Sequence, residues 1–168
     1  MYRYADDPKI ATILETNRIS IEQVDIPALV EVYDHWNKVR GDKFAPSLRE
    51  FRLDELPPAV IPGLAVVDFL GPPLDYFYRF FGSRMVEIAG MERTGKRYYA
   101  DAVKGYGFVN AEIFPIMIEE RRPIVSRTKW VSVKTLLYWT TTVRLPICAD
   151  GAAVTGGVTV NQYQLESD

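Results

Sequence analysis

The first forty residues change from a weakly patterned stretch to a clear helical repeat. Residues 1–24 mix polar and apolar positions without a sustained period, and we expect an N-terminal extension with room for a short helix. Apolar residues then recur at helical spacing from Ile26 to Trp36, which predicts an amphipathic helix. Asp25 is placed to cap the start of this helix, and Gly41 stands where a C-terminal cap belongs.

A second helical signal follows in the same segment. Ser47 and Glu50 have the spacing of a capping box, in which each side chain accepts a hydrogen bond from the other residue's backbone N–H. The prolines at 57 and 58 cannot continue a helix and therefore end it. We expect residues 25–60 to form a helical segment that packs either on a sheet or on a partner subunit.

From residue 61 onward the apolar pattern becomes that of a β-rich domain, which we assign to residues 61–168. Helical patterns at residues 83–89 and 108–121 divide the strands into a group of two and a group of three. Hairpin-length links between strands favour an antiparallel sheet, so the fold class is α+β. The predicted strands cover residues 64–70, 76–81, 124–133, 136–148 and 153–164.

The strand over residues 76–81 is apolar on both faces. Alternation places Arg79 on the same face as Phe77 and Phe81. A sheet with a solvated face would alternate apolar and polar residues, so the second face is covered, either by the helix of residues 26–40 or by another subunit. Arg79 is then either an anchor for a ligand carboxylate or phosphate in an aromatic-lined hollow, or an outward residue that pairs with a neighbouring strand or stacks on an aromatic ring.

The strand over residues 136–148 has a polar face. Tyr138, Thr140 and Thr142 alternate along one side of it, and Arg144 continues the series. Threonines between aromatic residues suit a pleated surface, and their hydroxyls also suit a pocket for a small ligand. Both interpretations stay open from the sequence.

Composition limits the chemistry that the chain can perform. A formal net charge of -2 lacks the basic character that nucleic-acid binding requires, so we expect no nucleic-acid partner. A single cysteine excludes an internal disulfide, and one histidine with one cysteine cannot supply the usual ligand set of zinc. We expect packing or surface roles for His35 and Cys148, and neither catalytic residues nor a metal site.

Three stretches approach known signals without meeting their requirements. Residues 56–74 are apolar, but the prolines among them are incompatible with a membrane-spanning helix. Residues 1–30 are rich in charge and lack the apolar core of a signal peptide, so we expect a cytoplasmic protein without membrane contact. Gly90 to Lys96 matches part of a phosphate-binding loop, but Arg97 stands where that motif needs Ser or Thr. We expect a basic surface loop there.

Several segments, taken in their order along the chain, resemble a known family. They are residues 32–41, Pro46, residues 61–68, residues 76–83 and residues 90–95. This series is similar to a bacterial subgroup of PAS domains, a set of short stand-alone proteins formerly grouped as a domain of unknown function. The similarity extends from about Val32 to about Tyr163.

The resemblance implies a PAS-like fold, a five-stranded antiparallel sheet with helices on one face, preceded here by N-terminal helices. It also implies sensing or protein interaction, with a small molecule held between sheet and helices, and no catalysis. The flavin branch of the family uses a cysteine on its first long helix, and the haem branch uses a histidine on the long helix before the third strand. The corresponding helices here hold neither residue, so we expect neither flavin photochemistry nor His-ligated haem, and the cofactor stays unknown.

We therefore expect a sensory or regulatory module of signal transduction that binds a small organic molecule, a protein partner or both. Such a module would signal by changing its interface with a second copy of the chain or with a protein partner. The alternative is a small enzyme whose curved sheet encloses an aromatic or lipid-like substrate, with an acid–base group such as a buried Asp68. A dimerisation module with a filled core is the third hypothesis. The residues expected to bind a ligand are Tyr78, Arg79, Met85, Tyr98, Tyr99, Tyr106, Trp130, Tyr138 and Thr140.

Overall fold

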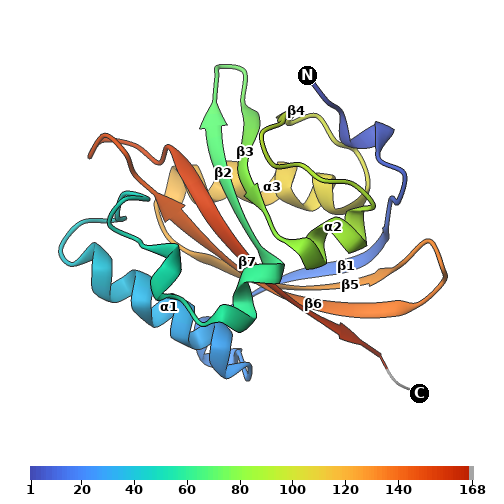
Figure 1. Cartoon of the computed structure of the whole chain (residues 1–168), viewed down its shortest axis with the longest axis horizontal. Coiled ribbons are helices and arrows are strands. Elements are labelled where there is room, and N and C mark those ends of the chain that lie inside the picture. Colours follow the sequence, from blue (N-terminus) through green and yellow to red (C-terminus); the bar gives the residue numbers. More distant parts are fainter. Residues whose placement is uncertain (167–168) are drawn as a thin grey trace.

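The computed structural model describes residues 1–166, which form one antiparallel sheet with helices against it (Figure 1). The predicted α+β class is confirmed. The strands lie in the order β1-β5-β6-β7-β2-β3-β4, and each neighbouring pair is antiparallel. Their bounds are Thr12–Ile19 (β1), Leu64–Leu70 (β2), Asp75–Phe81 (β3), Arg97–Tyr99 (β4), Ile124–Val131 (β5), Leu137–Ile147 (β6) and Gly156–Leu165 (β7).

Helices connect and cover these strands. Within the described residues, no helix is long and apolar enough to cross a membrane. The α-helices are Pro27–Arg40 (α1), Ser83–Ala89 (α2) and Gly105–Glu120 (α3). The 3-10 helices are Tyr4–Asp6 (η1), Ile21–Gln23 (η2), Leu53–Glu55 (η3) and Pro58–Gly63 (η4).

The sheet has seven strands, so the expectation of five is wrong. The two strands that were not predicted, β1 and β4, lie at the edges of the sheet. β1 pairs with β5 and occupies much of the extension that was expected to hold only a short helix. Most β1 side chains are exposed, and a strand without a buried face shows no apolar alternation. β4, at the opposite edge, is only three residues long. The five predicted strands correspond to the contiguous strands β3-β2-β7-β6-β5.

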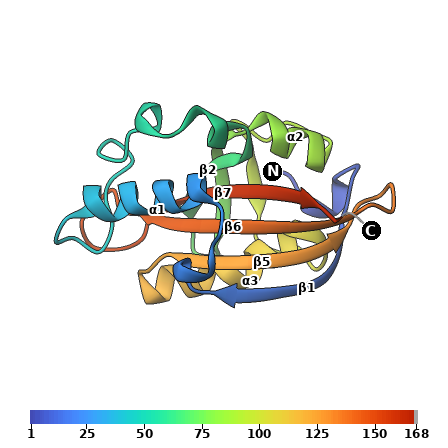
Figure 2. The same ribbon diagram turned by 90° about the horizontal axis from the view of Figure 1, so that it is seen from below.

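Helices cover both faces of the sheet, and of the two predicted covers for the second face the structure has the helix of residues 26–40. α1 lies on one face, where Trp36 and Val32 belong to the same apolar cluster as Val143 of β6. α3 lies on the other face, where Phe114 clusters with Val67 of β2. Figure 2 shows α1 in front of the strands and α3 behind them. The N-terminal helical segment thus packs on the sheet of its own chain.

The central strand β6 faces both helical layers. Residues 140–147 are all buried. Alternation sends Val143 and Leu145 toward α1. Thr142 and Arg144 point to the opposite side, where the Arg144 guanidinium reaches α3. One face of the strand is therefore hydrocarbon, and the other buries polar groups.

A β-bulge in β3 overturns the predicted orientation of its last residues. The pairing of β3 with β2 shifts by one residue between Tyr78 and Phe80, so Arg79 has no partner across the ladder. The extra residue reverses the alternation that follows it. Phe81 therefore lies beside Tyr78, with ring centres 5.4 Å apart, and not on the side of Phe77 and Arg79.

The ends of the N-terminal helices follow the predicted signals in part. α1 has Gly41 as its C-cap, as predicted, but the helix begins at Pro27 and its N-cap is Ile26 in place of Asp25. The capping box forms, since Ser47 N–H donates to Glu50 at 3.0 Å and Glu50 N–H donates to Ser47 at 3.2 Å. It closes a single turn and no longer helix follows it.

Trp36 joins α1 to the sheet. Its side chain is buried, and its indole N–H donates to the carbonyl oxygen of Pro146 in β6 at 2.9 Å. The contact combines a large apolar area with a satisfied buried donor. It therefore anchors the helical layer on this face.

Replacing Trp36 by alanine should lower the free energy of unfolding by about 3–5 kcal/mol, because it leaves a cavity and an unpaired carbonyl in the core. Trp36→Phe keeps most of the ring volume and should cost less. Urea unfolding measured by circular dichroism tests both. The exposed Lys38→Ala on the same helix is the control, with an expected change within about 0.5 kcal/mol. A Trp36→Ala protein as stable as this control would contradict the prediction.

Candidate functional site

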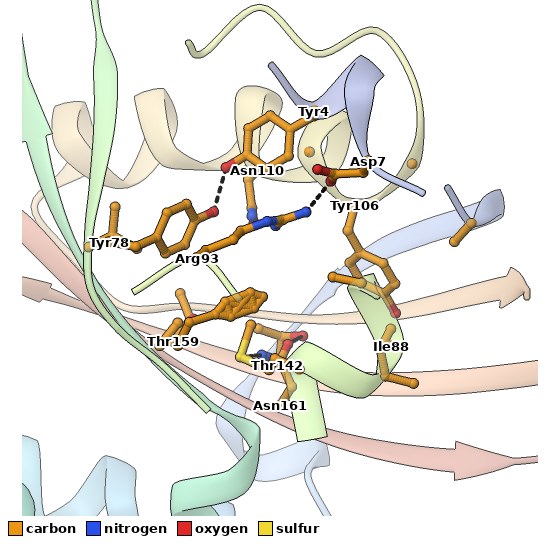
Figure 3. Close-up of a pocket in the computed structure, with 18 of the residues that line it drawn as sticks. Tyr4, Asp7, Tyr78, Ile88, Arg93, Tyr106, Asn110, Thr142, Thr159 and Asn161 are labelled. Carbon is orange, nitrogen blue, oxygen red and sulfur yellow. Dashed lines mark hydrogen bonds and ion pairs between the residues drawn. The ribbon is translucent and has the colours of Figure 1, made fainter. Parts of the chain in front are cut away.

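A cavity of about 60 Å³ lies on the α3 side of the sheet. It is bounded by the sheet, by α2 and α3, and by residues 2–11, which we name the N-terminal segment (Figure 3). A cavity of this size holds a few water molecules or a molecule of about four to six non-hydrogen atoms. The apolar part of its wall includes Ala65, Val67, Phe81, Met85 and Ile88.

The cavity wall is basic although the whole chain is slightly acidic. Lys9, Arg93, Lys104 and Arg144 are its basic residues, and Asp7 is the one acidic residue among the described residues that line it. Four positive charges and one negative charge give the wall a formal charge of +3, against -2 for the chain. The two lysines are exposed and the two arginines are buried.

The N-terminal segment closes one side of the cavity. Dashed lines in Figure 3 mark two of its polar contacts, between the hydroxyls of Tyr4 and Tyr78 and between the Asp7 carboxylate and the Arg93 guanidinium. Gly107 of α3 permits this close approach, because a Cβ at that position would lie 2.6 Å from the Tyr4 ring. The segment is thus held in place by groups that themselves line the cavity.

Arg93 lies between the N-terminal segment and the sheet, and its residue surface is 6% exposed. Its guanidinium carbon is 4.6 Å from the centre of the Tyr4 ring and 5.0 Å from that of Phe81, within the range of cation–π attraction. Arg93 Nε and Asp7 Oδ1 find no hydrogen-bond partner among the described residues. The expectation that residues 90–97 form a plain basic surface loop is therefore wrong for Arg93.

Arg144 is the most buried charge at the site, with 2% of its surface exposed. Its guanidinium donates to the Ser126 hydroxyl at 2.8 Å and to the Asn110 side-chain oxygen at 3.2 Å. Its Nε has no partner, and no ion pair to Arg144 is found in the described part of the chain. Burial lowers the pKa of Arg144 to about 10, so it remains a cation at neutral pH.

A hydrogen-bonded network forms the floor of the cavity on the sheet. The Thr142 hydroxyl donates to the side-chain oxygen of Asn161 at 2.7 Å. Behind the floor, the Trp130 indole N–H donates to the Thr140 hydroxyl at 2.8 Å, and the hydroxyl of Tyr106, which lines the cavity, lies 2.5 Å from the same oxygen. These bonds fix the rotamers of the floor, so the shape of the cavity is formed in advance.

The nine residues predicted to bind a ligand divide into those at the cavity and those away from it. Trp130 and Thr140 lie behind Tyr106 and support it through the hydrogen bonds just described, and Tyr138 stacks on Trp130 with ring centres 4.7 Å apart. Tyr106 lies in the first turn of α3, which begins three residues before the helix predicted over residues 108–121. Those that line the cavity directly are Tyr78, Met85 and Tyr106.

Two more of the predicted tyrosines lie beyond the cavity wall. Tyr98 is buried behind it, with its ring centre 4.8 Å from that of Tyr4 and 5.6 Å from that of Tyr78. Tyr99 lies under the Arg3 guanidinium, 4.1 Å from the ring centre. Tyr98 therefore buttresses the wall, and Tyr99 contacts the N-terminal segment from outside.

Arg79 has no part in the cavity, because the bulge directs it outward. Its Nε lies 2.8 and 2.7 Å from the two carboxylate oxygens of Asp68 on β2. Of its two predicted roles, the structure has the pairing with a neighbouring strand. Asp68 is half-buried in this pair and does not line the cavity, so it does not have the position that the enzyme hypothesis required of it.

Sequence reasoning missed both buried arginines. The alternation that places Thr140 and Thr142 on one strand face also places Arg144 there. The pattern therefore indicates Arg144, although the predicted ligand-binding residues do not include it. No local pattern marks Arg93, because its burial depends on the N-terminal segment folding over it. Asn110 lies on a helix that was predicted only from its apolar residues.

The lone histidine and cysteine are away from the cavity. His35 lies on α1, on the opposite face of the sheet, with Nε2 3.6 Å from a Glu55 oxygen. Cys148 is buried in the apolar cluster beneath α1. Residues 1–166 contain no group of His, Cys, Asp and Glu side chains that could hold a metal ion.

Comparisons with protein-family models, curated proteins and solved structures find no match for this chain. Its function is therefore inferred from the cavity and from the buried polar groups around it. The PAS resemblance stays a prediction.

Buried tyrosines around the cavity resist ionisation. Burial raises the pKa of Tyr98 to about 12 and that of Tyr4 well above its usual value of 10. The pKa values of Tyr76, Tyr106 and Tyr163 are also raised, with burial as the largest cause. Each hydroxyl is therefore a neutral donor or acceptor across the physiological pH range.

These tyrosines should make the protein lose stability in alkali. An unfolded tyrosine ionises near pH 10, so their contribution to stability is complete below about pH 10 and is lost as pH rises toward the folded pKa, about 12 for Tyr98. We expect the tyrosinate absorbance of the folded protein at about pH 11 to be lower than that of the unfolded chain, because the raised pKa values keep these tyrosines neutral. Tyr98→Phe should weaken the alkaline loss. Full tyrosinate absorbance in a protein that is still folded would contradict this.

Proposed function

We propose that the chain is a PAS-like sensory module that binds a small organic molecule in the cavity between its sheet and the helices α2 and α3, without catalysis. The observation that carries this proposal is a polar cavity with unmet hydrogen-bonding capacity. Among the described residues, the wall residues Asp7, Arg93 and Arg144 each have a buried side-chain atom without a partner. Buried polar groups are nearly always paired, and a bound molecule would supply the missing partners.

The order of the elements supports the PAS-like part of the proposal. When the edge strands β1 and β4 are set aside, five contiguous antiparallel strands remain. Along the chain they come as two strands, then helices, then three strands, which is the order that the resemblance implies. The cavity also lies between sheet and helices, where the resemblance places a ligand. β1 and β4 are additions to that pattern, and α1 corresponds to the N-terminal helices expected before it.

The N-terminal segment provides a route from ligand to interface. Tyr4 and Asp7 hold it to the cavity wall, so a ligand that changes the contacts of Arg93 also changes the hold on the segment. The segment continues into β1, an edge strand whose outer side pairs with no other strand among residues 1–166. Edge strands are ready templates for pairing with another chain. We place the signalling interface here, in a homodimer or with a protein partner.

The wild-type protein should bind small molecules. Native mass spectrometry of freshly purified protein tests for a ligand carried from the cell, and a thermal-shift panel of short acids, amides, alcohols and amines tests added ones. A ligand that binds only the folded state raises the melting temperature, and we expect a rise of at least about 2 °C at saturation for one class.

A variant that fills the cavity should abolish this shift. Ala65 is buried and lines the cavity, so Ala65→Leu places three more carbons in the space that the ligand needs. The same change at the exposed Ala59 is the matched control and should leave binding unchanged. If neither wild-type protein nor control binds any class of molecule, the ligand-binding proposal fails.

Ligand binding should also slow hydrogen exchange in the N-terminal segment. A filled cavity gives the segment a complete wall to pack on, so the opening that exposes its amides becomes rarer. We expect at least about threefold slower exchange across residues 2–11 with the best ligand of the panel, and no change in α1 on the opposite face. Protection confined to α1 would place the signal elsewhere.

A further inference from the structure

We infer that the ligand is a small carboxylate whose charged end meets the buried guanidinium of Arg144 and whose hydrocarbon part lies on the apolar wall. This inference rests on the proposed ligand-binding function and gives the chemistry of that same site. Its starting point is a cation with 2% of its surface exposed and no acidic partner among the described residues.

The hydrogen bonds of Arg144 are incomplete. A guanidinium carries five N–H donors, and here the protein acceptors are two neutral oxygens, on Ser126 and Asn110. The Nε N–H has no partner among residues 1–166. Burial of a charge without an opposite charge is costly, and neutral acceptors offset only part of that cost. A carboxylate in the cavity that Arg144 lines would supply the missing charge and two strong acceptors.

The surrounding charges favour an anion as well. The wall has a formal charge of +3, and its one acidic residue, Asp7, is already paired with Arg93. The exposed Lys9 and Lys104 stand at the same cavity, where they would raise the local concentration of anions. A cationic ligand would add to the repulsion, and a neutral one would leave Arg144 without an opposite charge.

The rest of the wall selects a carboxylate over an inorganic anion. Val67, Phe81 and Ile88 present hydrocarbon to the same cavity, and phosphate or sulfate would leave these surfaces against a strongly hydrated ion. A volume of about 60 Å³ suits a molecule of about four to six non-hydrogen atoms. Propionate, with a carboxylate and two further carbons, has this size and polarity, and it is the probe we choose.

The test compares propionate, its neutral isostere propionamide, and inorganic phosphate by calorimetric titration of the full chain at constant ionic strength. We expect the wild-type protein to bind propionate at least about tenfold more tightly than propionamide, and more tightly than phosphate. Because the acid and the amide have the same shape, the ratio reports the charge of the site and not its volume.

Two variants assign that ratio to one residue. Arg144→Met keeps the length of the side chain without its charge, and it should reduce the preference for the acid to less than about twofold. Arg127→Met removes an exposed arginine from the neighbouring strand β5 and should leave the preference unchanged. Arg144→Lys retains a charge in a different geometry and should keep a weakened preference for the acid.

Each outcome decides the question. Equal or tighter binding of propionamide by the wild-type protein, or tighter binding of phosphate, overturns the carboxylate assignment and leaves ligand binding intact. An acid preference that survives in Arg144→Met overturns the role of Arg144. Failure of the wild-type protein to bind any small molecule overturns the proposed function too. Should Arg144→Met not fold, the acid–amide ratio of the wild-type protein still decides the ligand class, and Arg144→Lys tests the residue.

Discussion

The complete burial of the central strand β6 is the constraint on which the rest of the structure depends. Residues 140–147 have no solvent on either side. The hydrocarbon face, with Val143 and Leu145, requires an apolar cover, and α1 supplies it through Trp36. The polar face requires hydrogen-bond partners, because a buried polar group without one costs more than the bond itself contributes. The helices, the neighbouring strands and the N-terminal segment are arranged around these two requirements.

On the polar face of β6, the protein supplies only some of the hydrogen-bond and charge partners that the buried groups need. The threonines are satisfied locally, Thr140 by Tyr106 and Trp130, and Thr142 by Asn161. The charge of Arg144 is not, because the surrounding acceptors are neutral. A network that is partly satisfied is less favourable than an apolar core of the same shape. Its presence beside an open volume is therefore better explained by binding than by stability.

The sequence predicts well what depends on periodicity and poorly what depends on tertiary contact. The five central strands and α1 have one or two buried faces, and burial imposes the alternation or the helical stripe by which they are recognised. β1 has mostly exposed side chains and β4 only three residues, so neither shows such a pattern. The bulge at Arg79 also leaves no pattern in the sequence, because one extra residue is recognised only from the pairing of β3 with β2.

The same distinction explains the site. Alternation alone assigns Arg144 to the same strand face as Thr140. The position of this buried arginine could therefore be predicted from the sequence of the strand. Arg93 is buried only because Tyr4 and Asp7, almost ninety positions earlier, fold over it. The residue that creates the need for an anion thus belongs to a central strand of the sheet, whereas the ion pair that closes the cavity joins Arg93 to the N-terminal segment. A ligand that contacts both would couple the cavity to the segment, which is how the binding of a small molecule can change an interface.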